Sequence, residues 1–187
     1  MNDEELIELC REGEESAFEE LIKKYHAPIY NYIYNFTGDK QLTEDIVQET
    51  FIKMINNILK YKRIRGTKFS TWLFTIARNT LNDEYRKMKT RRTVSLEEAE
   101  LSIESKDFVE TRVIQNDTMD SINQAINSLK KEEKSAIYLR YYMDLSYKDI
   151  ADILKSTQNR VKWQLHDALI KIRKIIVSKE VNTDEVW

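Results

Sequence analysis

Residues 145–154 read Leu-Ser-Tyr-Lys-Asp-Ile-Ala-Asp-Ile-Leu, residues 155–156 read Lys-Ser, and residues 157–166 read Thr-Gln-Asn-Arg-Val-Lys-Trp-Gln-Leu-His. Ser146 is a favourable N-cap for a short helix, in which Ala151 is small enough to let a second helix cross closely. That second helix, capped by Ser156 or Thr157, would be anchored by apolar residues one turn apart: Val161, Leu165 and Leu169. The pattern predicts a helix-turn-helix.

The second helix of this motif carries the residues that would meet DNA. In helix-turn-helix proteins the N-terminal part of the second helix lies in the major groove. We therefore predict that duplex DNA is contacted by Arg160, Lys162, Trp163, Gln164, His166 and Asp167. Although Asp167 is an acid, it could accept a hydrogen bond from a cytosine amine. The alternative is a helical hairpin with no role in DNA binding.

The composition of the chain favours helices on both sides of this motif. Its 187 residues include three glycines and one proline, which leaves little material for the turns of an all-β fold. Hydrophobic residues make up 41% and charged residues 33%, so the chain can form a core and still be well solvated. We predict an all-α protein of two helical domains joined by a flexible linker, with the helix-turn-helix in the C-terminal domain.

The sequence lacks the residue sets that several classes of function would need. A single cysteine, Cys10, excludes an internal disulfide and a multi-cysteine zinc site, and two distant histidines do not suggest a metal site. No Ser/His/Asp or Cys/His set suggests a nucleophile. We therefore expect no catalytic residues, no metal and no cofactor. No stretch approaches the roughly 18 apolar residues of a membrane span, and the expected location is the cytoplasm.

The charge is distributed in blocks. Residues 61–92 carry ten bases against two acids, a net of +8, and residues 145–179 carry eight against three, a net of +5. Residues 93–120 between them carry two bases against eight acids, a net of −6. Weak periodicity and acids predict a linker at 93–107, between domains at 1–92 and 108–187. The two basic blocks suggest two surfaces that face a polyanion, although solvated helix faces are the alternative.

Aromatic and basic residues alternate in the first basic block. Tyr61, Phe69 and Trp72 are interleaved with Lys68, Arg78 and other cations. Aromatic faces can stack on unpaired bases while the cations neutralise the backbone, which is typical of single-strand binding. The alternative is that Trp72 and Phe74 are ordinary core residues.

Two stretches of the N-terminal half resemble a known family. They are Thr-Glu-Asp-Ile-Val-Gln-Glu-Thr-Phe-Ile-Lys at 43–53 and Lys-Phe-Ser-Thr-Trp-Leu-Phe-Thr-Ile-Ala-Arg-Asn at 68–79. Both resemble the first conserved domain of the extracytoplasmic function (ECF) sigma factors of bacterial RNA polymerase, and the helix-turn-helix resembles their second domain. The resemblance implies a promoter-specificity subunit that binds core RNA polymerase, recognises the minus-35 element as duplex and the minus-10 element as a melted strand. It also implies an anti-sigma factor as inhibitor, often membrane-anchored.

The resemblance assigns roles to residues by position. It implies docking to core polymerase through Asp45, Gln48, Glu49 and Lys53. It implies that the minus-10 strand is held by residues of the aromatic and basic stretch: Tyr61, Arg63, Arg65, Lys68, Phe69, Trp72, Arg78, Asn79 and Arg86. The C-terminal domain departs from the family, which often has arginines where this chain has Gln164, Asp167 and Leu169.

Two other readings compete with this one. The first is a stand-alone helix-turn-helix regulator that binds duplex operator DNA without polymerase. The second is a protein-interaction adaptor whose basic helices bind an acidic partner. The first leaves the polar face at 45–49 and the aromatic and basic stretch unexplained, and the second predicts no transcription in a reconstituted assay.

Overall fold

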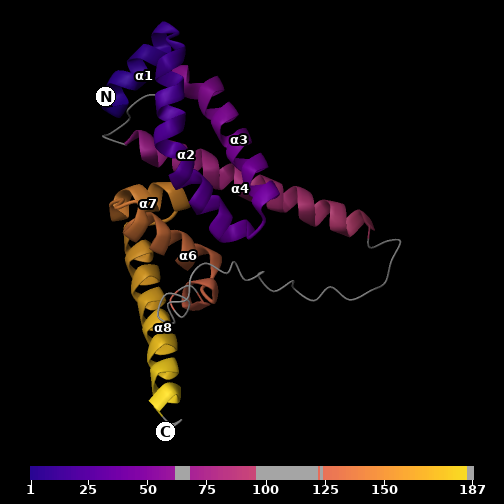
Figure 1. Cartoon of the computed structure of the whole chain (residues 1–187), viewed down its shortest axis with the longest axis vertical. Coiled ribbons are helices and arrows are strands. Elements are labelled where there is room, and N and C mark those ends of the chain that lie inside the picture. The colour runs from indigo at the N-terminus through magenta and orange to yellow at the C-terminus, as the bar shows by residue number, and fades with distance from the viewer. Residues whose placement is uncertain (62–67, 96–121, 123, 185–187) are drawn as a thin grey trace. The chain divides into compact units, whose positions relative to one another are not determined.

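The structure, a computed structural model, describes residues 1–61, 68–95, 122 and 124–184, with only the backbone described at 91–95 and 178–184 (Figure 1). All regular elements in these ranges are helical, which confirms the predicted all-α class. The chain divides into two compact units, residues 1–109 and 110–187. The predicted linker at 93–107 falls mostly outside the described residues.

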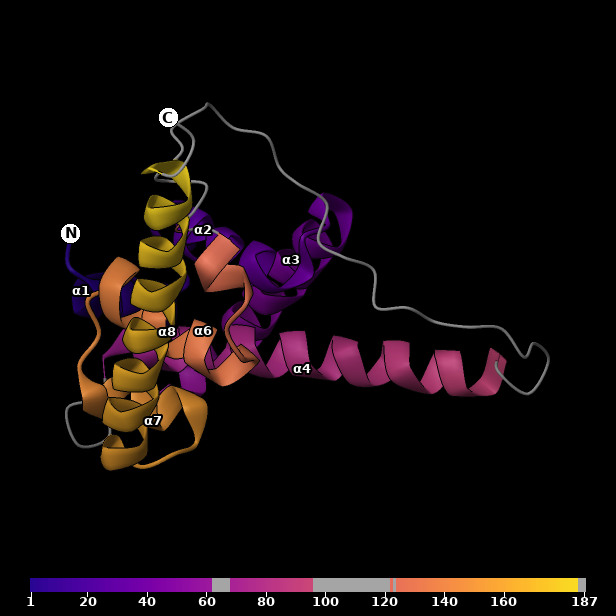
Figure 2. The same ribbon diagram turned by 90° about the horizontal axis from the view of Figure 1, so that it is seen from below.

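Where the structure describes it, the first unit contains four α-helices and one short 3-10 helix. They are α1 (Asp3–Glu12), α2 (Glu15–Thr37), α3 (Lys40–Asn57), η1 (Ile58–Lys60) and α4 (Phe69–Ser95). Helix α3 packs against both α2 and α4, and α1 packs against α2 and η1. Fully buried side chains from these helices form the core, among them Leu21, Tyr32, Met54 and Phe74. Helix α4 extends well beyond this core (Figure 2).

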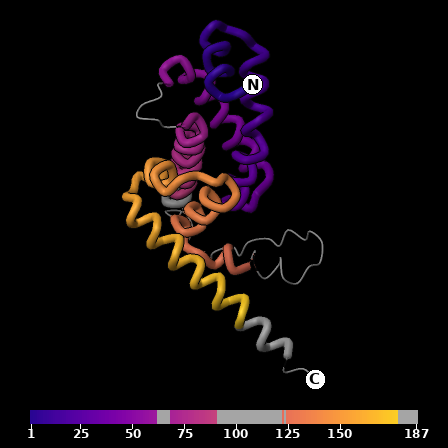
Figure 3. Tube along the Cα trace, turned by 90° about the vertical axis from the view of Figure 1, so that its left-hand side faces the viewer, coloured from indigo at the N-terminus to yellow at the C-terminus, as the bar shows by residue number. Residues whose placement is uncertain are grey.

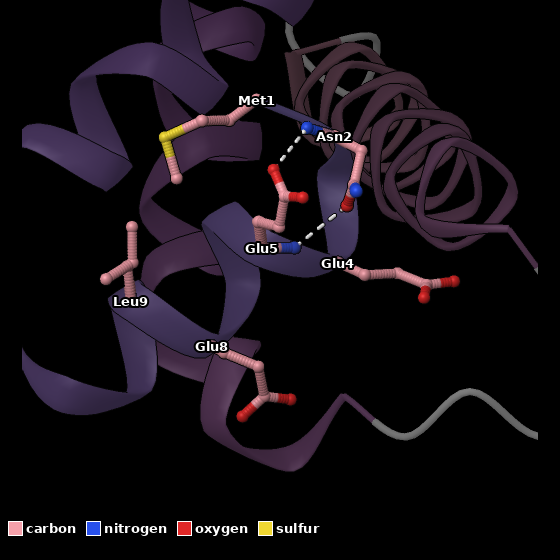
Figure 4. Close-up of a pocket in the computed structure, with 6 residues that line it drawn as sticks. All are labelled: Met1, Asn2, Glu4, Glu5, Glu8 and Leu9. Carbon is pink, nitrogen blue, oxygen red and sulfur yellow. Dashed lines mark hydrogen bonds between the residues drawn. The ribbon is translucent and has the colours of Figure 1, made fainter.

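The ends of these helices follow local side-chain chemistry. Asn2 and Glu5 cap α1 reciprocally, with both backbone-to-side-chain hydrogen bonds at 3.0 Å (Figure 4). Gly13 ends α1 in the left-handed region, at φ 89°, where glycine avoids a steric penalty. Asp39 caps α3 by accepting from the Leu42 amide at 2.9 Å. The apolar periodicity of the sequence predicts a helix from Thr43, but with this cap α3 begins three residues earlier, at Lys40.

Helix α2 differs from the sequence pattern at its start, and it contains an internal proline. Ser16 and Glu19 match the sequence pattern of a capping box and predict a helix that begins near Ser16, but the helix begins at Glu15 and its N-cap, Glu14, makes no side-chain cap. Pro28 lies inside α2, which continues through it to Thr37. A proline removes one backbone donor without breaking the helix when the flanking turns are held by packing. Ile29 and Tyr32, both fully buried, supply that packing.

The second unit contains α6 (Lys131–Ile137), η2 (Tyr138–Tyr142, a π-helix), α7 (Tyr147–Leu154) and α8 (Gln158–Asp184). Helix α8 packs against α6 and α7, and it runs as one long helix (Figure 3). The apolar pattern of the sequence predicts that this helix ends near Val177, but it continues for seven more residues, to Asp184. Ile150, Val161 and Leu139 are fully buried in this unit.

Lys134 is a buried cation in the second unit, and it makes stability depend on pH. Its Nζ donates to Asn127 Oδ1 at 2.8 Å, and burial lowers its pKa to about 8. Because the folded-state pKa lies below that of the unfolded chain, folding disfavours the charged form. Stability should therefore rise as the pH increases from about 8 towards the unfolded pKa.

We expect the free energy of unfolding to rise by about 1 kcal/mol between about pH 7 and about pH 9.5 on this account. Lys134→Met should be more stable than the parent chain near pH 7 and should lack this contribution. Urea titrations of both proteins at the two pH values measure the difference. A parent-minus-variant difference that does not change with pH would contradict the assignment.

Among the described helices, none combines the length and the apolar character that a bilayer-spanning segment requires. Among the described residues, no three His, Cys, Asp or Glu side chains are grouped so that they could hold a metal ion.

Candidate nucleic-acid interface

The helix-turn-helix is formed by α7, a short turn and α8. Ser146 Oγ accepts from the Asp149 amide at 3.1 Å, and the Ser146 amide donates to Asp149 Oδ2 at 3.3 Å. Lys155 adopts the left-handed conformation at φ 51° and ends α7. Thr157, rather than Ser156, caps the second helix, because its Oγ1 accepts from the Arg160 amide at 3.2 Å.

The packing between α7 and α8 follows the predicted spacing with one exception. Ala151, Val161 and Leu165 are buried, as the motif requires. Leu169, expected as the third anchor, is instead 43% exposed, and the fully buried residue at this depth is Ala168. The anchor therefore lies one position earlier, on the face of α8 that turns towards α6 and α7.

The predicted groove-facing residues of α8 do not all share one surface. Arg160, Lys162, Trp163 and His166 are exposed, and the Trp163 side chain is 63% exposed. Gln164 is only 6% exposed, and its Oε1 has no hydrogen-bond partner among the described residues. Gln164 thus lies on the packed side of α8, contrary to the expectation that it faces a groove.

Asp167 is held by an ion pair rather than presented freely. Lys171 Nζ lies 2.7 Å from Asp167 Oδ2 and 2.7 Å from Glu133 Oε1 on α6. The hydrogen bond from Lys171 lowers the pKa of Asp167, so the carboxylate is charged and engaged. A cytosine amine would have to compete with Lys171 for this acceptor.

Tyr147, at the first position of α7, was not singled out by the sequence analysis. Lys162 Nζ lies 5.5 Å from the centroid of its ring, and Arg140 Cζ lies 5.1 Å from the same centroid. Arg140 also donates to the Leu145 carbonyl at 2.9 Å. The ring therefore holds Lys162 next to the N-terminal turn of α7 through a cation–π contact. The sequence signal that could have pointed to Tyr147 is an aromatic residue directly after the N-cap serine, Ser146.

Three aromatic side chains of the first unit form one cluster, which we call the aromatic cluster: Tyr61, Phe69 and Trp72. The Tyr61 and Trp72 rings are 5.1 Å apart between centroids, and Phe69 lies 5.5 Å from each of them. Tyr61 and Phe69 are buried, whereas Trp72 is half-buried, so Trp72 presents the accessible ring. Phe74, as the alternative reading held, is a core residue.

Only some of the cations expected around the aromatic cluster lie among the described residues. Lys68 is exposed, and Arg63 and Arg65 lie outside the described residues. Trp72, Asn79 and Arg86 follow each other at seven-residue spacing along α4, so they share one face of the helix. The predicted contact residues further along α4 differ in exposure. Arg78 and Asn79 are half-buried, whereas Arg86 is exposed, and its Nη1 lies 3.4 Å from Asp83 Oδ1.

The polar face of α3 is exposed, and an apolar stripe extends it. Asp45, Gln48 and Glu49 are exposed; Lys53 is half-buried between Glu49, at 3.4 Å, and Thr80 Oγ1 of α4, at 3.3 Å. The stripe continues through exposed apolar residues: Ile52, Ile55 and Leu59. The sequence pattern groups Ile55 with the other apolar residues of this helix, yet its side chain is 40% exposed. We call Asp45, Gln48, Glu49, Ile52, Ile55 and Leu59 the α3 face.

Family comparisons match both units. The sigma-70 region 2 family matches residues 21–92, and the sigma-70 region 4 family matches residues 125–174. The two matches include α2 to α4 in the first unit and α6 to the middle of α8 in the second.

Curated proteins match along most of the chain. The ECF RNA polymerase sigma factor SigW of Bacillus subtilis is 32% identical over 176 residues, covering 90% of this chain and 93% of that protein. The RNA polymerase sigma factor YlaC of the same organism is 29% identical over 160 residues, covering 84% and 91%.

Solved structures share the fold. CnrH, in complex with the cytosolic domain of CnrY, is 20% identical with a TM-score of 0.68, covering 94% of this chain and 97% of that chain. The sigma factor RpoE of Bartonella quintana, in complex with the anti-sigma factor NepR, is 22% identical with a TM-score of 0.66, covering 85% and 96%.

Proposed function

This chain belongs to the ECF family of RNA polymerase sigma factors, and we propose that its two helical units divide promoter recognition between them. As an alternative sigma factor it binds core RNA polymerase and directs promoter-specific transcription initiation. The observation that carries this function is the presence of both sigma-70 regions in one chain, together with 32% identity to SigW over nearly the full length of both. A stand-alone regulator is not favoured, because it needs no region 2.

Run-off transcription tests the function directly. Core RNA polymerase is supplied with a library of genomic fragments, with and without this protein, and the transcripts are sequenced. We expect defined start sites that require the protein, preceded by shared minus-35 and minus-10 elements. A set of start sites that is the same with and without the protein would overturn the proposal.

Because binding energy alone opens DNA, we propose that the chain itself catalyses no reaction and needs no cofactor.

We propose that the α3 face and Lys53 dock on core polymerase. The support is a row of exposed residues that runs along α3 into η1, polar at Asp45 and Gln48 and apolar at Ile52, Ile55 and Leu59. Exposed apolar side chains bordered by polar ones are typical of protein–protein interfaces. This assignment adds the apolar stripe to the residues that the sequence suggested.

We propose that the melted minus-10 strand runs along α4. Trp72 offers a ring for stacking, Asn79 offers donors and acceptors to a base edge, and Arg86 offers charge to a phosphate. Their common face supports the assignment, and the remaining predicted contacts are Tyr61, Arg63, Arg65, Lys68, Phe69 and Arg78. Tyr61 and Phe69, being buried, would act by supporting Trp72.

We propose that α8 reads the minus-35 duplex through its exposed residues, Arg160, Lys162, Trp163 and His166.

Lys162→Ala should weaken binding of a minus-35 duplex by the holoenzyme about fivefold and reduce its salt dependence by about one counterion. Electrophoretic shifts of the duplex across a salt series measure both. Transcription from a template that is already melted at the minus-10 element should change little. An equal loss on melted and duplex templates would contradict the assignment.

We propose that the protein acts in the cytoplasm and that an anti-sigma factor inhibits it, as the complexes of CnrH and RpoE suggest. A membrane-anchored inhibitor would hold it at the inner face of the membrane. Co-purification with the chain from cells, before and after mutation of the α3 face, would identify such a partner.

A further inference from the structure

Helix α1 lies outside the sigma-70 region 2 match, which begins at residue 21, and the proposed function gives it no role. Its outer surface carries Glu4, Glu5 and Glu8, which line a shallow pocket with Met1 and Asn2 (Figure 4). Such an acidic surface repels phosphates, so α1 itself is a poor contact for DNA. Nevertheless, the Arg11 side chain of α1 reaches Tyr61 of the aromatic cluster, and the Asp3 side chain reaches Tyr25, which packs against the cluster.

Arg11, in the last turn of α1, makes the first connection. Its Nη2 donates to the backbone carbonyl of Tyr61, a residue 50 positions away in the sequence. Its Nη1 donates to Glu8 on the same helix, which holds the guanidinium in orientation. A charged donor makes a stronger hydrogen bond to a carbonyl than a neutral donor does. Arg11 thus holds the backbone at the residue whose ring contacts both Phe69 and Trp72.

Asp3, in the first turn of α1, makes the second connection. Asp3 Oδ2 accepts from the Tyr25 hydroxyl at 2.6 Å, and Asp3 Oδ1 accepts from Lys24 Nζ at 2.6 Å. The Tyr25 ring packs edge-on against Phe69, with the centroids 5.6 Å apart. Burial and the hydrogen bond to Asp3 raise the pKa of Tyr25, so the phenol remains a donor at physiological pH. The two ends of α1 therefore hold the same cluster from two sides.

We propose that α1 braces the aromatic cluster for stacking on the unpaired minus-10 strand, with Arg11 and Asp3 as positioning residues. The proposal rests on the proposed function of the cluster. A ring that is already in place stacks on a base without the entropic cost of being ordered, so fixing Tyr61 and Phe69 strengthens binding at Trp72. Neither Arg11 nor Asp3 needs to contact the DNA.

The test compares holoenzymes assembled from core polymerase and the full chain. The probe is a fluorescent single-stranded oligonucleotide that carries the non-template minus-10 sequence of a promoter found by run-off transcription. We expect Arg11→Met to weaken its binding about five- to tenfold, and Arg11→Lys, which keeps one charged donor, to stay within about threefold of the parent. Affinity for core polymerase should not change. Lys23→Met, an exposed cation lost from the same unit, is the matched control and should bind as the parent does.

A double-variant cycle separates bracing from general destabilisation. In a Trp72→Ala background, Arg11→Met should cost little further strand affinity, because the ring that it positions is gone. Additive losses would overturn the proposal, and so would an Arg11→Met variant that binds the strand like the parent. A parallel loss of core affinity would show a merely structural role and would also overturn it. Asp3→Ala should repeat the pattern, and it decides the matter if Arg11→Met does not fold.

The failure of the underlying function looks different. If the parent holoenzyme itself shows no preference for the minus-10 strand, the proposed role of the cluster fails, whatever the variants do. If the parent shows that preference and the α1 variants retain it, the brace alone fails.

Discussion

Replacing Ile55 with arginine is expected to weaken binding to core polymerase by about ten- to a hundredfold, which is typical of losing a central apolar contact at an interface. Ile55 lies in the middle of the apolar stripe of the α3 face, with Ile52 one turn before it on α3 and Leu59 after it in η1. An arginine at this position would bring an unpaired charge into a desolvated contact. Titration of labelled core polymerase with the variant measures the change in Kd.

The fold should tolerate this substitution, because the Ile55 side chain is 40% exposed and a long side chain can extend into solvent. Val177→Arg is a matched control, since it places the same charge on an exposed apolar position of the other unit. We expect Asp45→Ala and Gln48→Ala to cost less, about three- to tenfold each, because they remove polar contacts without adding a buried charge. Unchanged affinity in Ile55→Arg would remove the apolar stripe from the docking surface.

Replacing Trp72 with alanine is expected to weaken binding of the minus-10 single strand by about ten- to thirtyfold. Stacking of one base on an aromatic ring contributes about 1–3 kcal/mol, and every 1.4 kcal/mol changes the affinity tenfold. The loss should persist on a template that is already melted, because the ring acts on the unpaired state. Fluorescence anisotropy of a labelled oligonucleotide with the holoenzyme gives the affinity.

Trp163→Ala is the natural counterpart, since it removes an exposed indole from the second unit. It should spare the single strand and weaken the minus-35 duplex, the reverse of Trp72→Ala. Trp72→Phe should recover part of the strand affinity. If Trp72→Ala and the parent bind the strand equally, Trp72 belongs to the core and another residue captures the base.

The helix-turn-helix was predictable because its determinants are local. A cap at Ser146, a small residue at Ala151 and apolar residues at Val161 and Leu165 all act within a few turns of the chain, and the structure has each of them as expected. Gln164 could not be placed in the same way. A polar residue next to an exposed tryptophan looks solvated from the sequence, and only the packing of α8 against its neighbours buries it.

The α3 face shows a different limit. Apolar residues on a helix fit a periodic pattern whether or not another helix covers them, so the pattern included Ile55 with the core. Helix α3 packs on α2 and α4, and the stripe left uncovered depends on where those two helices lie. The contact of Arg11 with Tyr61 joins segments 50 residues apart and leaves no local trace in the sequence.

Lys53 belongs to the proposed docking residues, yet its Nζ donates to Thr80 Oγ1 on α4, between Arg78 and Arg86 in the sequence. One hydrogen bond therefore joins the helix proposed to meet the polymerase to the helix proposed to meet the strand. Thermodynamic reciprocity then sets a condition: whatever factor the enzyme adds to affinity for the strand, the strand must add to affinity for the enzyme. An open promoter would on that account retain its initiation factor more tightly than a closed one.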